Sequence, residues 1–296
     1  MSQRLPPASL VYKEQLNFLC YGDALWKPTP KPDYTRINIG DVGFIHRGEF
    51  HLLFSAGSPL GQRRLGVDVP ITFEQLDIGT LVSSEPRPPG CLHSLTVRRI
   101  AGDLPDTEFT PLSSKYGIDF SFDLTGDHGA ALVTRYPTYR EDSPLNAAFE
   151  TYTKHHYESW VAFARDKQYG DNIQPILVSG VDMTKDFAMV AYSNKDAPHV
   201  PRPAFTIPMF PSNSAPFQGR WRARYFPNIN LGPRVEQPMH FLPDAGSTTD
   251  EFNQCVFVRH YTMRSRWWGL FPKVIRVGTG PHDLSPGDNR GDAHWN

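Results

Sequence analysis

The sequence lacks every short motif that would identify an enzyme class on its own. Its 296 residues contain no Walker A loop, no G-x-G-x-x-G fingerprint, no H-E-x-x-H, no paired C-x-x-C and no G-x-S-x-G nucleophile elbow. No run of about 18 apolar residues is present, the length that a helix needs to span a bilayer. These absences weaken the case for a nucleotide-binding protein, a zinc protease, an α/β-hydrolase or a protein with a transmembrane helix.

Cysteine and net charge are equally sparse. The three cysteines are widely spaced and form neither a disulfide framework nor a zinc signature, as expected of thiols in a reducing compartment. Lys13 and Glu14 interrupt the N-terminal apolar stretch, so no secretory signal peptide is indicated. With a formal net charge of −1, the chain as a whole is not expected to bind polyanions. We expect a soluble protein of the cytoplasm or nucleus.

The composition is that of a folded protein. A 39% hydrophobic and 12% aromatic content argues against disorder over most of the chain. The 28 prolines predict a large irregular fraction and little helix. We expect an α+β fold with a mixed or mainly antiparallel sheet. One domain over residues 1–277, with a possible boundary near 83–90, and a flexible tail at 278–296 account for the length.

The clearest element is a long helix predicted over 143–169. Ser143 is suited to cap its first turn, and Pro144 fits the first helical position, where a missing N–H costs nothing. Gly170 can adopt the left-handed conformation that ends a helix. One apolar stripe recurs at helical spacing and consists of Leu145, Phe149, Tyr152, His156, Trp160 and Phe163. We expect this stripe to pack on the sheet.

Strands are predicted on both sides of this helix. The apolar or alternating segments lie at 118–124, 129–135, 175–181 and 186–192. The last two are separated by a short turn and could pair as a hairpin. A second hairpin is predicted over 39–57, and a further strand over 253–262.

Ten prolines lie between Pro198 and Pro243. Because proline cannot donate to a β-ladder, this stretch cannot form the interior of a sheet. Its many aromatic residues favour an ordered segment that wraps the outside of the protein over a mobile excursion.

Two turns and one helical histidine are the candidates for catalysis. Asp127 and His128 lie on one predicted turn, and Asp182 and Asp186 lie on another. If both turns are at the same end of the sheet, carboxylates and an imidazole converge, as a divalent metal or acid–base chemistry needs. His156, on the apolar stripe, would be an imidazole kept neutral by burial. The structural alternatives are ordinary turn formers and a hydrogen-bonded core histidine.

Arginine and aromatic residues form two clusters, within 220–225 and 259–268. Their candidate partner-binding residues are Arg220, Trp221, Arg222, Arg224, Arg264, Arg266, Trp267 and Trp268. This combination suits protein-interface hot spots. It also suits single-stranded nucleic acid, which offers phosphate charge and stacking bases. The alternative is solvated strand edges with cation–π packing.

Several longer phrases resemble a protein family. They are YGDALWKP at 21–28, IGDVGFIHRGEFHLLFSAG at 39–57, PLGQRRLGVDVP at 59–70, RYPTYRED at 135–142, YTKHHYESWVAFARD at 152–166, ILVSGVDMTKDFAMVAYSN at 176–194, QCVFVRHYTMRSR at 254–266 and GPHDL at 280–284. Together they resemble a large, lineage-expanded family of intracellular proteins of mushroom-forming basidiomycete fungi, over nearly the whole chain. The resemblance implies a source and a compartment, and it brings no catalytic residue with it.

The leading hypothesis is a soluble intracellular binding or regulatory protein that acts through a protein partner and needs no cofactor. One alternative is a metal-dependent hydrolase that uses Asp127, His128, His156 and Asp182 with a divalent metal. Another is single-stranded nucleic-acid binding through the two arginine and tryptophan clusters. A membrane-perforating role, suggested by the helix-then-hairpin order, is a more distant alternative.

Overall fold

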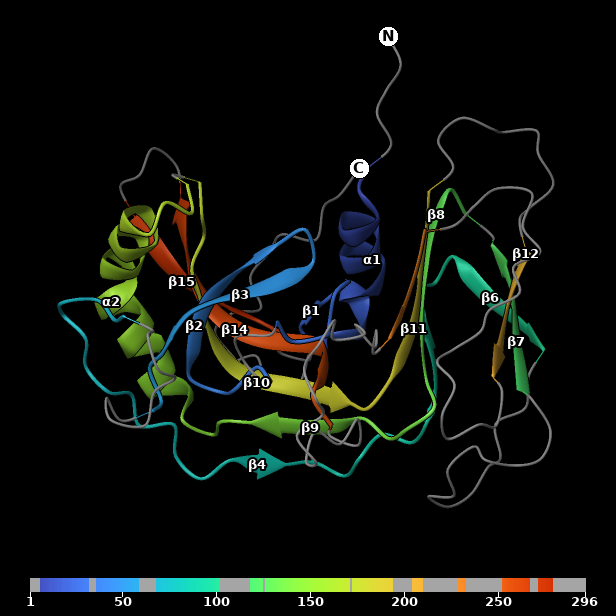
Figure 1. The fold of residues 1–296 in the computed structure, drawn as a ribbon, viewed down its shortest axis with the longest axis horizontal. Helices are drawn as coiled ribbons and strands as arrows, with labels where there is room; N and C mark the ends of the chain where they lie inside the picture. The colour runs from blue at the N-terminus through green and yellow to red at the C-terminus, as the bar shows by residue number, and fades with distance from the viewer. Residues whose placement is uncertain are drawn as a thin grey trace, which may run out of the picture.

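The computed structural model describes residues 6–31, 36–58, 68–101, 118–124, 126–170, 172–193, 204–209, 228–232, 252–266 and 271–278. Within these ranges the chain forms two α-helices and three antiparallel sheets (Figure 1). Strands outnumber helices, and one helix is long, so the predicted α+β class with a mainly antiparallel sheet is confirmed.

The largest sheet has eight strands. Its central order is β1 (Asp23–Ala24), β14 (Gln254–Arg266), β10 (Ile176–Thr184), β2 (Asp41–His46) and β3 (Glu49–Ser55). Three further strands extend it, because β15 (Phe271–Val277) pairs with β14, β9 (Tyr139–Asp142) pairs with β10, and β4 (Val82–Ser83) pairs with β9. The predicted hairpin at 39–57 is β2–β3, and its turn places Arg47 and Gly48 at φ of 51° and 75°. Positive φ at both central residues matches the twist of the flanking strands.

Two smaller sheets complete the strand inventory. The four-stranded sheet has the order β13 (Asn228–Gly232), β11 (Phe187–Ser193), β8 (His128–Thr134) and β5 (Gly90–His93). The three-stranded sheet has the order β12 (Ala204–Met209), β7 (Ile118–Leu124) and β6 (Val97–Ala101). The strands from the proline-rich stretch, β12 and β13, both lie at sheet edges, where a missing backbone donor is tolerated. The rest of that stretch lies outside the described residues.

The expected hairpin of the two central strands is not found. β10 pairs with β14, β2 and β9, whereas β11 pairs with β8 and β13 in another sheet. The two residues between them, Lys185 and Asp186, turn the chain from one sheet into the next (Figure 1). All nine residues of β10 are buried, and a strand buried on both faces cannot be assigned its neighbours from a turn signal alone. The segment 68–81 forms neither a strand nor a helix.

The long helix, α2 (Asn146–Asp166), begins three residues later than predicted. The Ser143 hydroxyl donates to the carbonyl of Ile78 and accepts from the N–H of Leu145, so it anchors the entry to the helix rather than its first turn. After the helix, Gly170 adopts a φ of 106°, as expected. The predicted stripe is confirmed: Phe149, Tyr152, His156 and Trp160 are buried, and Phe163 packs against the same core.

A second, shorter helix fills the space between two sheets. Helix α1 (Ala8–Leu16) continues into the 3₁₀ turn at Asn17–Leu19 and lies between the main sheet and the β8–β11 layer (Figure 1). Its Val11, Tyr12 and Leu16 are buried in a cluster with residues of β8, β11 and β14. Thus α1 and α2 pack on separate cores, α2 with β2, β3, β10 and β14, and α1 with β8 and β11.

An arginine lies fully buried in the main sheet. The Arg259 guanidinium donates to the carboxylates of Asp142 and Asp182, and its Nη1–Asp182 Oδ1 distance is 2.6 Å. Its other hydrogen bonds go to the backbone carbonyls of Tyr21, Glu141 and Val181. Because all five guanidinium N–H groups have acceptors, the charge is compensated inside the protein. The pKa of Arg259 is raised, since the attraction of the two carboxylates outweighs the opposing effect of burial.

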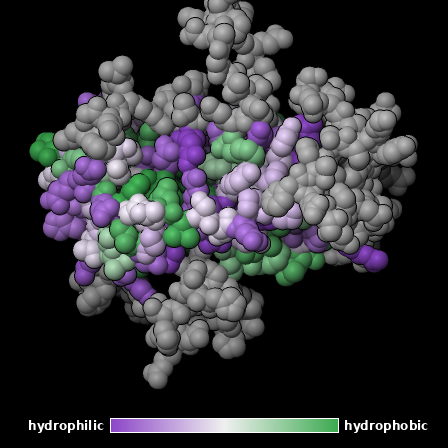
Figure 2. Space-filling view, turned by 90° about the horizontal axis from the view of Figure 1, so that it is seen from below, coloured by the Kyte–Doolittle hydropathy of each residue, from purple (hydrophilic) through white to green (hydrophobic). Residues whose placement is uncertain are grey.

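The segment around the possible domain boundary is tied to this network. Ser83 pairs with Glu141 of β9, Arg87 bridges to Thr138, and the Arg87 side chain forms an ion pair with Asp182. Seen from below, the described surface mixes hydrophobic with hydrophilic residues (Figure 2). Neither helix in the described ranges is long and apolar enough to cross a membrane.

Candidate functional site

A cleft opens where two hairpins diverge from the start of β10. β2 pairs with β10 only through Gly43–Ile176 and Val42–Leu177, so its last three residues continue without β10 beside them. On the other side, β14 pairs with β10 up to Tyr261 and then runs on, accompanied by β15. The cavity between the hairpins has a volume of about 650 Å³, within the size range of small-molecule sites. We call it the hairpin cleft.

The lining of the hairpin cleft combines cationic, aromatic and aliphatic side chains. Its polar and charged members are Lys13, Asp23, His46, His51, Asn172, Gln174, His260, Thr262 and Arg264. Its apolar members are Phe44, Ile45, Tyr169, Ile173, Ile176, Ile275 and Val277. Asp23 is the one carboxylate among these lining residues, set against a lysine, an arginine and three histidines. The cleft therefore favours an anionic group on a ligand that also has an apolar part.

The most specific arrangement in the cleft is a buried histidine–aspartate pair. The Nε2 atom of His260 lies 3.1 Å from Asp23 Oδ2, and Lys13 Nζ donates to the same oxygen at 2.7 Å. Burial alone would raise the pKa of Asp23, but the hydrogen bond and charge of His260 and the charge of Lys13 lower it below its ordinary value. Asp23 is thus anionic and orients the imidazole.

The second nitrogen of this histidine is unpartnered. His260 is 4% exposed, and its Nδ1 makes no hydrogen bond within the part of the chain that the structure describes. If Nε2–H donates to Asp23, Nδ1 is the acceptor of a neutral ring or the donor of a charged one. Since buried polar atoms are normally paired, such an atom beside a cleft is where a ligand or ordered water belongs.

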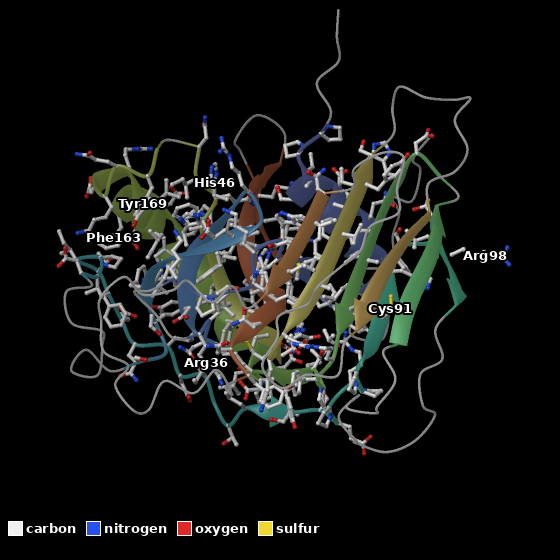
Figure 3. All side chains as sticks on the ribbon, turned by 45° about the vertical axis from the view of Figure 1, so that its right-hand side comes forward. Arg36, His46, Cys91, Arg98, Phe163 and Tyr169 are labelled. Carbon is white, nitrogen blue, oxygen red and sulfur yellow. The ribbon has the colours of Figure 1, made fainter. Side chains whose placement is uncertain are left out.

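The opposite wall is built by aromatic rings. Phe44 stacks on His51 with ring centroids 4.8 Å apart and meets Tyr169 edge-to-face at 5.2 Å. The side-chain view shows His46, at the end of β2, close to Tyr169, which follows α2 (Figure 3). Burial and the nearby Lys31 lower the pKa of His51, and its Nε2 also has no hydrogen-bond partner among the described residues. A flat apolar group would contact this wall while its charge faced His260.

The structure does not bring the four predicted catalytic residues together. The Asp182 carboxylate is fully buried between Arg87 and Arg259 and is not free to bind a metal. His128 pairs with Ser193 at the end of β11. Asp182 does not lie on a turn as predicted but within β10, before the turn of Lys185 and Asp186 that leads to the start of β11. Seven strand residues separate these ends by roughly 20 Å. The turn before His128 and the turn after β10 therefore lie at opposite ends of β11, and the predicted convergence is not found.

His156 has different neighbours from those predicted. The described residues include one group of three whose possible ligand atoms all lie within 4.8 Å, and it consists of Glu74, His155 and His156. Asp127, His128 and Asp182 are not part of it.

The predicted partner-binding clusters are described only in part. Arg264 is exposed and lines the hairpin cleft, and Arg266 pairs with Phe271 in the β14–β15 ladder. Arg259, at the start of the second cluster, is buried and cannot reach a phosphate or a partner. The other predicted residues of both clusters lie outside the described ranges.

Asp23 and His260 were missed by sequence analysis because 237 positions separate them. Their neighbouring phrases, YGDALW and VRHYT, carry no known spacing, and only the β1–β14 pairing brings them together. Comparison with known proteins adds no assignment, since no family model, curated protein or solved structure matches the chain.

Proposed function

We propose that this is a binding protein whose hairpin cleft takes an organic anion, a carboxylate or phosphate group joined to an apolar body. The observation that carries the proposal is the buried His260 on the wall of a 650 Å³ cleft. Asp23 holds one of its nitrogens, and the other has no hydrogen-bond partner among the described residues. Arg264 adds positive charge, whereas the charge of Lys13 is paired with that of Asp23. The wall formed by Phe44 and Tyr169 suits the apolar body.

The test is binding of phenyl phosphate and benzoate by isothermal titration calorimetry, with benzyl alcohol as the neutral analogue. We expect the two anions to bind and the neutral analogue to bind more weakly. A charge-assisted hydrogen bond contributes about 1.5–3 kcal/mol, so the variant H260A should weaken anion binding by roughly 10- to 100-fold.

The matched control is H128N, because His128 lies outside the cleft and the structure shows no ligand role for it there. Its affinity should equal that of the wild type. Equal binding of anions and the neutral analogue, or undiminished anion binding by H260A, would remove the proposal. The separate variant R264Q tests whether the exposed Arg264 contributes to anion binding.

Partner-protein binding, the leading hypothesis from the sequence, is the second candidate. The observation in its favour is that Arg264, from a predicted partner-binding cluster, lies on the cleft, so a partner's acidic side chain could supply the anionic group. Cross-linking of the wild type and of the variant R264E should then give band patterns that differ in one species, the protein cross-linked to its partner. An unchanged set of cross-linked species would count against it.

We also propose an intracellular compartment. Its support is that Cys20, Cys91 and Cys255 form no disulfide bond with one another. Labelling of the protein in intact cells with a thiol reagent tests this, because an oxidised, unreactive Cys20 and Cys91 would contradict it.

A further inference from the structure

Two adjacent histidines of α2 lie beside a carboxylate from a distant loop. His156 is on the buried face, 5% exposed, and His155 is exposed, with ring centroids 4.8 Å apart. The Glu74 Oε2 atom is 3.5 Å from His156 Nε2, and one potential ligand atom from each of the three residues lies within 4.8 Å of the other two. None of these residues lines the hairpin cleft.

The loop that carries Glu74 is fixed to the rest of the protein. The Tyr152 hydroxyl donates to the backbone carbonyl of Glu74 at 2.6 Å, one helical turn before His156. Two residues later, the N–H of the buried Leu76 donates to the carbonyl of Ala56 at 2.9 Å. The backbone positions of the carboxylate and the imidazoles are therefore set before any ligand arrives, which lowers the entropy cost of binding.

The donor set selects a class of metal ion. Two imidazole nitrogens and one carboxylate oxygen suit Zn²⁺ and its first-row neighbours, whereas Mg²⁺ and Ca²⁺ prefer oxygen ligands alone. Zinc bonds of about 2.0–2.2 Å place ligand atoms roughly 3.3–3.5 Å apart. The ligand atoms, now within 4.8 Å of one another, must therefore move about 1 Å closer to bind one zinc ion. This movement is open to the exposed side chains of His155 and of Glu74, which is 71% exposed.

The buried imidazole is suited to its role. Tyr152 lies 4.3 Å from the His156 ring, centroid to centroid, which restrains the ring's orientation. An open pocket of about 450 Å³, which Thr151 and Asp77 also line, adjoins the group and leaves room for a water molecule or substrate on the metal.

We propose that Glu74, His155 and His156 bind a single late first-row divalent metal ion, with Zn²⁺ the first candidate, in an open three-ligand site. A site with three protein ligands and a solvent-accessible fourth position is the arrangement of catalytic rather than structural zinc. The metal also ties the 73–79 loop to helix α2, and its binding stabilises the folded protein.

The test is titration of the metal-free full chain with ZnCl₂ by isothermal titration calorimetry, repeated with MgCl₂. Zn²⁺ should bind with a stoichiometry of one, and Mg²⁺ should not. The variants H155A and E74Q change exposed side chains, so they should fold normally and lose more than about 100-fold in Zn²⁺ affinity, beyond the loss typical of outer-shell substitutions. CoCl₂ should give visible absorption bands that both variants lack.

The matched controls are E158Q on the same helix and H128N on β8, which should bind Zn²⁺ as the wild type does. The proposal fails if H155A and E74Q keep wild-type affinity, or if H51A in the hairpin cleft removes Zn²⁺ binding instead. It also fails if the wild type binds no Zn²⁺. Because H156A opens a buried position and can unfold the protein, the exposed variants decide the outcome.

Discussion

The buried Arg259 provides the most demanding test of the fold. In the variant R259M, a shorter, flexible and uncharged side chain replaces that of arginine and removes its five hydrogen bonds. Asp182 and Asp142 keep Arg87 and Arg140 as partners, but three backbone carbonyls lose a donor. We expect a large loss of folding free energy, because the substitution removes one member of a buried ion network and leaves the others in place.

The magnitude follows from burial. Breaking a buried pair by removing one partner costs about 3–5 kcal/mol, whereas an exposed pair contributes about 0–1 kcal/mol. The side chains of Arg259 and Asp182 are 1% and 0% exposed, so the larger range applies. With an m-value of roughly 3 kcal/mol/M for a chain of this size, the urea midpoint should fall by about 1–2 M.

The assay is urea denaturation followed by far-UV circular dichroism and by tryptophan fluorescence. The control is R36M, because Arg36 pairs with Glu141 at side-chain exposures of 37% and 28%, and it should lose less than about 1 kcal/mol. In the double variant R259M/D182N, the loss should be at least about 1 kcal/mol smaller than the sum of the single losses. Additive losses, or an R259M midpoint equal to that of R36M, would refute the buried network.

Three further measurements test the burial of Trp160, Cys255 and Asp23. The variant W160A should lose about 3–5 kcal/mol of folding free energy by urea denaturation, because Trp160 is 1% exposed in the α2 core, and a loss under 1 kcal/mol would contradict that packing. Cys255 should stay unreactive toward a thiol reagent until urea unfolds the protein, since burial raises its pKa. The half-buried Cys20 and Cys91 should react in the native state, and rapid labelling of all three thiols would contradict this. The pKa of Asp23 is lowered from 3.8, so its carboxylate stabilises the fold above that pH, and this contribution is lost as the pH falls through the folded pKa. The difference in unfolding free energy between wild type and D23N should therefore shrink from pH 6 to pH 3. A constant difference would contradict the pairing.

Local features of the fold were predictable from the sequence, because they rest on short-range patterns. The β2–β3 hairpin has two apolar runs around a glycine turn, and the buried face of α2 repeats at 3.6 residues. The start of α2 was misplaced because Ser143 uses its hydroxyl on Ile78, a residue 65 positions away. Hydrogen bonds of that range leave no trace in a local pattern.

Which strands pair, and which polar residues meet, could not be predicted in the same way. A short turn between β10 and β11 indicates a hairpin, yet the two strands pair in different sheets. In those sheets both faces of each strand are covered by the rest of the protein. The Asp23–His260 pair and the Glu74–His156 pair join segments more than 80 positions apart. For His156, burial was predicted correctly, but its acidic neighbours were expected from the turns that carry Asp127 and Asp182, whereas Glu74 comes from a separate loop.

The place of β14 in the main sheet has a consequence for how the protein is made. This strand is encoded near the end of the chain, at 254–266, yet it pairs with β1, β10 and β15, and its contact with Asp23–Ala24 spans more than 230 positions. A ribosome must therefore translate beyond Arg266 before the largest sheet can close, and until then β1 and β10 have an unfilled edge. Long-range pairing of this kind is slow, so the incomplete sheet leaves the nascent chain exposed to aggregation during synthesis.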